Sequence, residues 1–92
     1  MSFEVFTYRV SKQPKVVFKK LGKEKAWGRY FSDKNLIEID ERLKGKKLLE
    51  IYVHEFLHHL FPNFSEDEIV RLGRELTEYL WKHNYRKIDN QI

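Results

Sequence analysis

The 92-residue chain contains no cysteine, one methionine, two prolines and four glycines. Without cysteine it forms no disulfide and offers no thiolate to a metal, so any metal site must use histidine, aspartate or glutamate. The chain lacks the run of roughly 20 apolar residues that a membrane-spanning helix requires. Residues 1–5 do not begin a signal peptide, because no basic segment followed by an apolar run is present. We therefore expect a cytoplasmic protein with no membrane partner.

The composition is sufficient for a small hydrophobic core, since 41% of the residues are hydrophobic and 15% are aromatic. A chain of this length is near the lower limit at which one core stabilises a domain. The net charge of +4 is unevenly placed: residues 12–47 hold twelve Lys and Arg against five Asp and Glu, and residues 48–92 hold five against eight. A basic front half indicates either a surface for nucleic acid or an acidic protein, or lysines that protect the edges of a small sheet.

The first 40 residues predict short strands, because segments rich in β-branched and aromatic residues alternate with polar turns. The candidate strands are residues 3–10, 15–18, 26–31 and 36–40. A short polar turn, residues 32–35, joins the last two, which predicts an antiparallel hairpin. Gly28 within a strand indicates a bulge or the close approach of another backbone.

The remaining residues predict two helices and a polar tail. Apolar residues cover almost the whole circumference of residues 46–61, which predicts a central helix that ends at Pro62. Ser65 and Glu68 then form a capping-box pattern for a second helix that ends near His83. We therefore expect an α+β fold in which a small, mostly antiparallel sheet packs on a central helix followed by a second helix. It forms a single domain over residues 1–92, with strands mostly in 1–40, helices in 41–83 and a tail at 84–92.

The central helix carries the sequence HEFLH, residues 54–58. Residues four apart on a helix share one face, so His54 and His58 can hold one metal ion between them. Glu55 is rotated from His54 by about a hundred degrees and can act as a base without binding the ion. Two histidines and a glutamate are costly in an otherwise apolar helix, which favours a functional reading over a pair of hydrogen-bonded core histidines.

A catalytic zinc ion usually has three protein ligands and one water molecule. The short connection after the first helix brings the first turn of the second helix, with Glu66, Asp67 and Glu68, close to His58. Glu68 lies beside the face formed by Ile69, Leu72, Gly73, Leu76 and Leu80, so we expect it to be the third ligand. Glu66 is an alternative, and Asp67, the distant His83 or no third protein ligand stay open. Acids in a first turn also favour the helix dipole, and Glu68 also completes a capping box.

With these motifs the chain resembles the gluzincins, in which a second helix supplies a glutamate ligand after the HExxH helix. It is similar to the ImmA/IrrE-type peptidases and to the minigluzincins. The similar stretches are residues 28–30, 36–40, 54–58 and 68–73. The resemblance implies a zincin-like fold with His54, His58 and Glu68 as zinc ligands, Glu55 as general base, and substrate along an edge strand.

These observations predict a zinc metallopeptidase that hydrolyses peptide bonds of a peptide or protein substrate through a metal-activated water. Glu55 between the two histidines supports catalysis, since a purely structural zinc site does not need it. The alternative is a non-catalytic zinc-containing module whose basic face binds nucleic acid or a protein partner. Salt separates the two, because binding to phosphates weakens steeply with ionic strength and zinc-dependent cleavage does not.

Overall fold

The computed structural model describes residues 11–22 and 26–88. In chain order these form β1 (Lys15–Lys19), β2 (Gly28–Phe31), β3 (Leu36–Asp40), α1 (Gly45–Leu60) and α2 (Glu66–Lys82). The α+β class and the order of strands before helices agree with the sequence prediction. The strand expected at residues 3–10 lies outside the described residues. Within the described part of the chain, no helix combines the length and the apolar character needed to cross a bilayer.

The three strands form one sheet in the order β1-β3-β2. β2 and β3 pair antiparallel, from Gly28 opposite Ile39 to Phe31 opposite Leu36, which confirms the predicted hairpin. β1 pairs parallel with β3, so the sheet is mixed rather than mostly antiparallel. The alternation of apolar residues decides which face a side chain takes but not the direction in which two strands pair. After β1 the chain next enters the sheet as β2, at the far edge, and the hairpin then returns as β3 in the middle of the sheet. β3 therefore runs in the same direction as β1.

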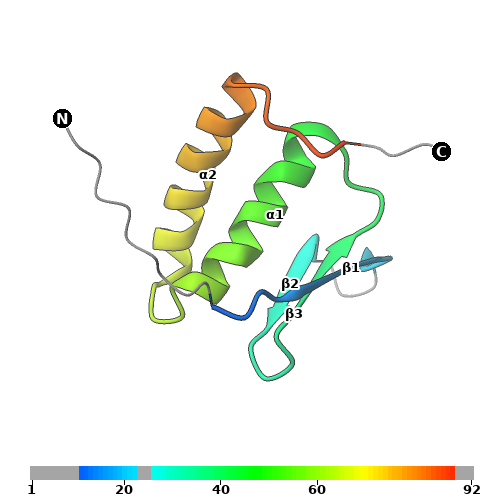
Figure 1. The fold of residues 1–92 in the computed structure, drawn as a ribbon, viewed down its shortest axis with the longest axis vertical. Coiled ribbons are helices and arrows are strands. Elements are labelled where there is room, and N and C mark those ends of the chain that lie inside the picture. The colour runs from blue at the N-terminus through cyan, green and yellow to red at the C-terminus, as the bar shows by residue number, and fades with distance from the viewer. Residues whose placement is uncertain (1–10, 23–25, 89–92) are drawn as a thin grey trace.

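α1 lies between the sheet and α2, as Figure 1 shows, so the central position predicted for this helix is confirmed. Its sheet-facing side packs against the core of the domain, in which Ile37 and Ile39 of β3 are fully buried. The other members of this core are partly or almost fully buried: Val16, Phe18, Tyr30, Leu43, Leu48, Ile51 and Phe56. The opposite side of α1 faces α2.

α2 begins with the predicted capping box, in which the Ser65 hydroxyl accepts from the Glu68 backbone N–H and the Glu68 carboxylate accepts from the Ser65 backbone N–H. Its buried residues are Ile69, Gly73 and Thr77, a stripe with spacings of four residues. Leu76, expected on the buried face, is 41% exposed. The face that meets α1 is thus rotated from the one that the leucines predict, and this rotation changes which acid of the first turn points toward α1.

The end of β3 is fixed by a buried carboxylate. The Asp40 side chain has no exposed surface and accepts from the Leu21 backbone N–H at 3.1 Å. It also accepts from the Arg42 backbone N–H at 2.9 Å and from the Arg42 guanidinium at 2.9 and 2.8 Å. The Arg42 hydrogen bonds hold the pKa of Asp40 well below its usual range, with a further contribution from Leu21. Asp40 therefore ties the segment after β1 to the turn that leads into α1.

Candidate metal centre

His54 and His58 lie in the second half of α1, one turn apart. Their ring centroids are 4.9 Å apart and the rings are nearly perpendicular, at 68°. The two Nε2 atoms approach to 3.3 Å. The side chains are 17% and 28% exposed, so the pair is partly covered and can still be reached from solvent. The helical spacing thus brings the two imidazoles to a common point, as predicted from the sequence.

The carboxylate beside this pair belongs to Glu66, the first residue of α2. Its Oε1 lies 2.8 Å from His54 Nε2, and its Oε2 lies 2.9 Å from His58 Nε2. The donor atoms of the three residues all lie within 4.8 Å of one another. Two helices therefore supply one cluster of two nitrogens and a carboxylate.

The turn between the helices positions Glu66. α1 ends with a hydrogen bond from the Phe61 N–H to the Leu57 carbonyl. The turn that follows is held by a hydrogen bond from the Phe64 N–H to the Phe61 carbonyl. Farther along α2, Gly73 faces α1: an added Cβ would lie 3.7 Å from Leu57 Cδ1 and 3.9 Å from His54 Cα. A small residue at this contact lets the two helices approach closely beside the histidines.

Glu68, the ligand expected from the sequence, is not in the cluster. Its carboxylate Oε1 accepts from the Ser65 backbone N–H at 3.3 Å and from the Ser65 hydroxyl at 3.0 Å. The physical reason is the capping box, which turns the side chain of the third helical residue back over the helix N-terminus. Glu66, two residues earlier, is on the stripe of Ile69 and Gly73 that faces α1. The capping pattern was visible in the sequence and already indicated that the Glu68 carboxylate has a partner.

Glu55 lies on the side of α1 that faces β2 and is only 7% exposed. A Cβ added to Gly28 would lie 2.6 Å from Ile51 Cγ2, 3.0 Å from Glu55 Cγ and 3.1 Å from Glu55 Oε2. The sequence suggested a bulge or the close approach of another backbone at Gly28, whereas the atoms that come close belong to side chains of α1. Burial, with a smaller contribution from the negative charge of Glu66, raises the pKa of Glu55 to about 7. A carboxyl group with this pKa exchanges its proton near neutral pH.

The other two histidines lie apart from the cluster. The His59 ring points toward β2, where Nδ1 is 3.0 Å from the Tyr30 hydroxyl and Nε2 is 3.4 Å from the Ser11 hydroxyl. His83 caps the far end of α2 and packs against the ring of Tyr79, with centroids 4.5 Å apart. Asp67, another alternative ligand, is exposed and is not a member of the cluster.

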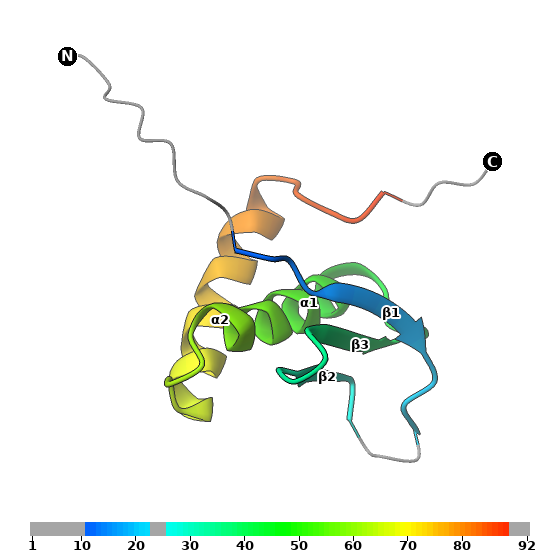
Figure 2. The same cartoon turned by 60° about the horizontal axis from the view of Figure 1, so that its bottom comes forward.

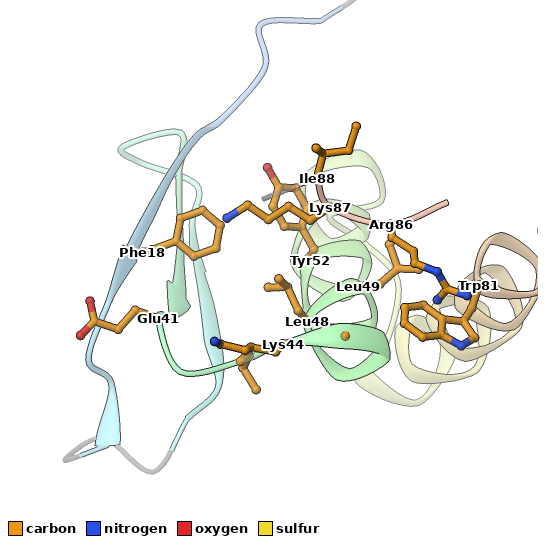
Figure 3. A pocket seen from close by; sticks show the side chains of 12 residues that line it. Phe18, Glu41, Lys44, Leu48, Leu49, Tyr52, Trp81, Arg86, Lys87 and Ile88 are labelled. Atoms are coloured by element: carbon orange, nitrogen blue, oxygen red, sulfur yellow. The ribbon is translucent and has the colours of Figure 1, made fainter. Parts of the chain in front are cut away.

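A separate hollow of about 790 Å³ lies at the opposite end of α1 (Figure 3), and no histidine lines it. It is bordered by Phe18, Leu48 and Tyr52 and by the described part of the C-terminal tail. This tail crosses from α2 toward β1: the Arg86 guanidinium lies 3.4 Å from the Trp81 ring centroid, and Lys87 Nζ lies 4.1 Å from that of Phe18. The described part of the tail therefore covers this hollow instead of the histidine cluster.

The cluster of His54, His58 and Glu66 is thus a candidate metal centre, with Glu55 buried beside it. Comparison of the chain with protein-family models, with curated proteins and with solved structures gives no match. The chemistry of the site itself therefore carries the functional argument.

Proposed function

We propose that the chain is a zinc-dependent peptidase in which His54, His58 and Glu66 hold the ion and Glu55 is the general base. The observation that carries the proposal is the convergence of three donors from two helices on one point, within 4.8 Å of one another. Two imidazoles and one carboxylate are a donor set typical of catalytic zinc in peptidases, where the fourth position is open.

The spacing of the donors supports zinc. Two ring nitrogens lie 3.3 Å apart and face one carboxylate, so a cation among them would be held by the carboxylate charge and by the lone pairs of the ring nitrogens. A tetrahedral zinc ion with bonds to nitrogen of about 2.0–2.1 Å separates two such nitrogens by about 3.3–3.4 Å. The distance between the two nitrogens equals this spacing, whereas the carboxylate oxygens, 2.8 and 2.9 Å from the nitrogens, must move outward by about half an ångström to admit an ion. When bound, zinc supplies Lewis acidity, which makes water more acidic and polarises a carbonyl group.

Glu55 performs the proton transfers in this proposal. It follows His54 directly in the chain, but its carboxylate points toward β2 and not into the donor cluster. It can therefore accept the proton of an attacking water molecule and deliver it to the leaving amine without acting as a ligand. Its burial against Gly28 and Ile51 keeps the carboxylate in one position and away from bulk water.

β2 supports a peptide as the substrate. It is an edge strand, paired with β3 on one side, and among the described strands none pairs with its other edge. The backbone groups of a free edge bind an extended peptide by adding a strand. Gly28 places this edge directly beside Glu55, so a peptide bound along β2 passes close to the general base.

The ligand assignment is tested with two glutamates of the same helical turn. Glu66→Gln removes a charged donor from the cluster, and we expect zinc affinity to fall by at least tenfold. Glu68→Gln is the matched control, because glutamine also completes a capping box and zinc affinity should not change. The measurement is the zinc content of purified protein, followed by competition with a chelating dye. Loss of zinc from the Glu68 variant and not from the Glu66 variant would reverse the assignment.

The catalytic role is tested with Glu55→Gln, which we expect to retain one zinc ion per chain and to lose hydrolysis of a fluorogenic peptide library. General bases contribute about 10²–10⁴ to the rate. His59→Ala is the control for a change in the same helix, since His59 contacts Tyr30 and lies outside the cluster. A Glu55→Gln protein with unchanged activity would exclude Glu55 as the base, and an inactive wild type that binds zinc would exclude the peptidase.

A further inference from the structure

The sheet has two faces, and α1 packs on one of them. Gly28 faces α1, as its contacts with Ile51 and Glu55 show, and Ile37 and Ile39 are buried in the same core. Because successive side chains of a strand point to opposite faces, Arg29 and Phe31 of β2 point away from α1. Trp27 directly precedes β2, and its carbonyl accepts from the Asp40 N–H of β3, so it continues this alternation. In the described part of the chain, no helix packs on this second face (Figure 2), which we call the outer face.

The outer face carries two aromatic rings, one on β2 and one on the residue directly before it, with an arginine between them. Trp27 is 47% exposed, and the Arg42 guanidinium lies 5.6 Å from its ring centroid. Phe31 is partly exposed, and its ring centroid lies 5.4 Å from the Arg29 guanidinium and 5.3 Å from Lys34 Nζ. Each ring thus has at least one cation over it, so a base would stack on a part of the ring that the cation does not cover. Aromatic rings next to cations are the elements from which proteins build platforms for unpaired bases.

The charge of the outer face is positive. The register of β1 places Lys15 beside Leu36 and Lys19 beside Asp40. Both lysines therefore lie on the outer face, across β3 from the two aromatic residues. Five cations belong to this face by register or by contact with a ring: Lys15, Lys19, Arg29, Lys34 and Arg42. Two carboxylates of β3, Glu38 and Asp40, offset part of this positive charge.

Both carboxylates are already paired. Glu38 accepts from Arg29 at 2.7 Å and from Lys19 at 3.4 Å, and Asp40 accepts from Arg42. Among the described residues, five cations against these two carboxylates and the neighbouring Glu41, which also acts on Arg42, leave an excess of two positive charges. Glu38 also holds Arg29 and Lys19 on the same face, so a cation of β2 and a cation of β1 are fixed on either side of β3. A polyanion therefore meets positioned cations next to exposed rings.

We propose that the outer face binds single-stranded nucleic acid, with bases stacked on Trp27 and Phe31 and phosphates near the lysines and arginines. Charge alone fits any polyanion, but an acidic peptide offers few planar rings to stack on aromatic side chains. A duplex keeps its bases stacked on each other and presents only phosphates to this face. A second copy of the chain would bring like charges together. The metal centre lies on the other side of α1, so its donor residues take no part in this binding.

The test measures binding of a fluorescein-labelled single-stranded oligonucleotide of mixed sequence to the full chain by fluorescence anisotropy. Trp27→Leu and Phe31→Leu keep apolar side chains and remove the rings, and each should weaken binding about tenfold or more. Tyr79→Leu is the matched control, since Tyr79 is a 63% exposed aromatic residue on α2, and binding should not change. Circular dichroism and thermal melting confirm that the leucine variants are folded.

The salt dependence tests the phosphate contacts. Lys15→Gln should reduce the slope of log affinity against log salt by about 0.7, the value for one contact to a single strand, and Lys82→Gln on α2 should leave it unchanged. Four results would overturn the proposal: no binding at low salt, full binding by folded Trp27 and Phe31 variants, equal affinity for a duplex, or equal competition by polyglutamate. The last would identify the face as a docking site for an acidic protein.

Discussion

The contact between Gly28 and α1 gives the sharpest prediction for stability. Replacing Gly28 by alanine places a methyl group 2.6 Å from Ile51 Cγ2 and 3.0 Å from Glu55 Cγ. Carbon atoms in favourable contact lie about 3.5–4.0 Å apart, so the strand and the helix must separate by about an ångström. Overpacking of this kind costs about 1–3 kcal/mol. The φ angle of Gly28 is not in the left-handed region, so alanine recovers about 0.5–1 kcal/mol of backbone entropy.

The expected net loss is about 1–2 kcal/mol in the free energy of unfolding, which lowers Tm by roughly 5–15 °C in a domain of this size. Thermal and urea unfolding followed by circular dichroism measure it. Gly73→Ala is the control, because its Cβ would meet its nearest neighbours at ordinary contact distances of 3.7 and 3.9 Å. Alanine in the interior of a helix is favoured over glycine by about 1 kcal/mol, so the Gly73 variant should be at least as stable as the wild type.

A double substitution identifies the contact responsible. Ile51→Ala removes the Cγ2 atom that the new methyl group would meet, so Gly28→Ala should cost less in the Ile51→Ala background than in the wild type. Gly28→Ala should also reduce hydrolysis, because its Cβ would lie 3.1 Å from Glu55 Oε2. A Gly28→Ala protein that melts at or above the wild-type temperature would show that β2 and α1 are not held together at this distance.

Three further predictions follow from the hydrogen bonds of the fold and from the metal centre. The lowered pKa of Asp40 stabilises the folded chain above the unfolded-state pKa of about 3.9, so stability should fall as the pH drops below about 4. Asp40→Asn should lower Tm at neutral pH and flatten this acid dependence, and melting curves from pH 7 to pH 3 check both. Ser65→Ala should cost about 1 kcal/mol in urea unfolding, because it removes the cap of α2, whereas Glu68→Gln should cost little. A chelator should lower Tm of the wild type and not of His58→Ala; equal shifts in both would count against ligation by His58.

The elements themselves could be read from the sequence because local chemistry decides them. The alternation in residues 36–40 gave β3 with its observed bounds, and Pro62 and the Ser65 cap gave the break between the helices to within a residue or two. The pair of His54 and His58 follows from the geometry of one helix and needs no knowledge of tertiary packing. Predictions that depend on a single element were therefore reliable.

The third donor depends on how two helices face each other, and local patterns did not decide that. Leu72 and Leu76 suggested a buried face adjacent to Glu68, but α2 turns Gly73 and Thr77 toward α1 and leaves Leu76 exposed. A glycine and a threonine permit a closer approach than leucines do, and this packing selects Glu66. The parallel pairing of β1 was also out of reach, because it is set by the path of the chain across the sheet.

The short link between the helices has a consequence for the order of folding. All donors of the candidate metal centre lie between residues 54 and 66, on an αα-hairpin closed by residues 61–65. The β1–β3 pair joins residues 21 positions apart, such as Lys15 and Leu36, and closing a longer loop costs more entropy and slows folding. The helical hairpin can therefore form first and assemble the complete donor set while Glu55 is still exposed to water. Glu55 becomes buried, and its pKa rises through desolvation, only when β2 docks with Gly28 against α1. The donor cluster can therefore assemble before the buried environment of Glu55 does.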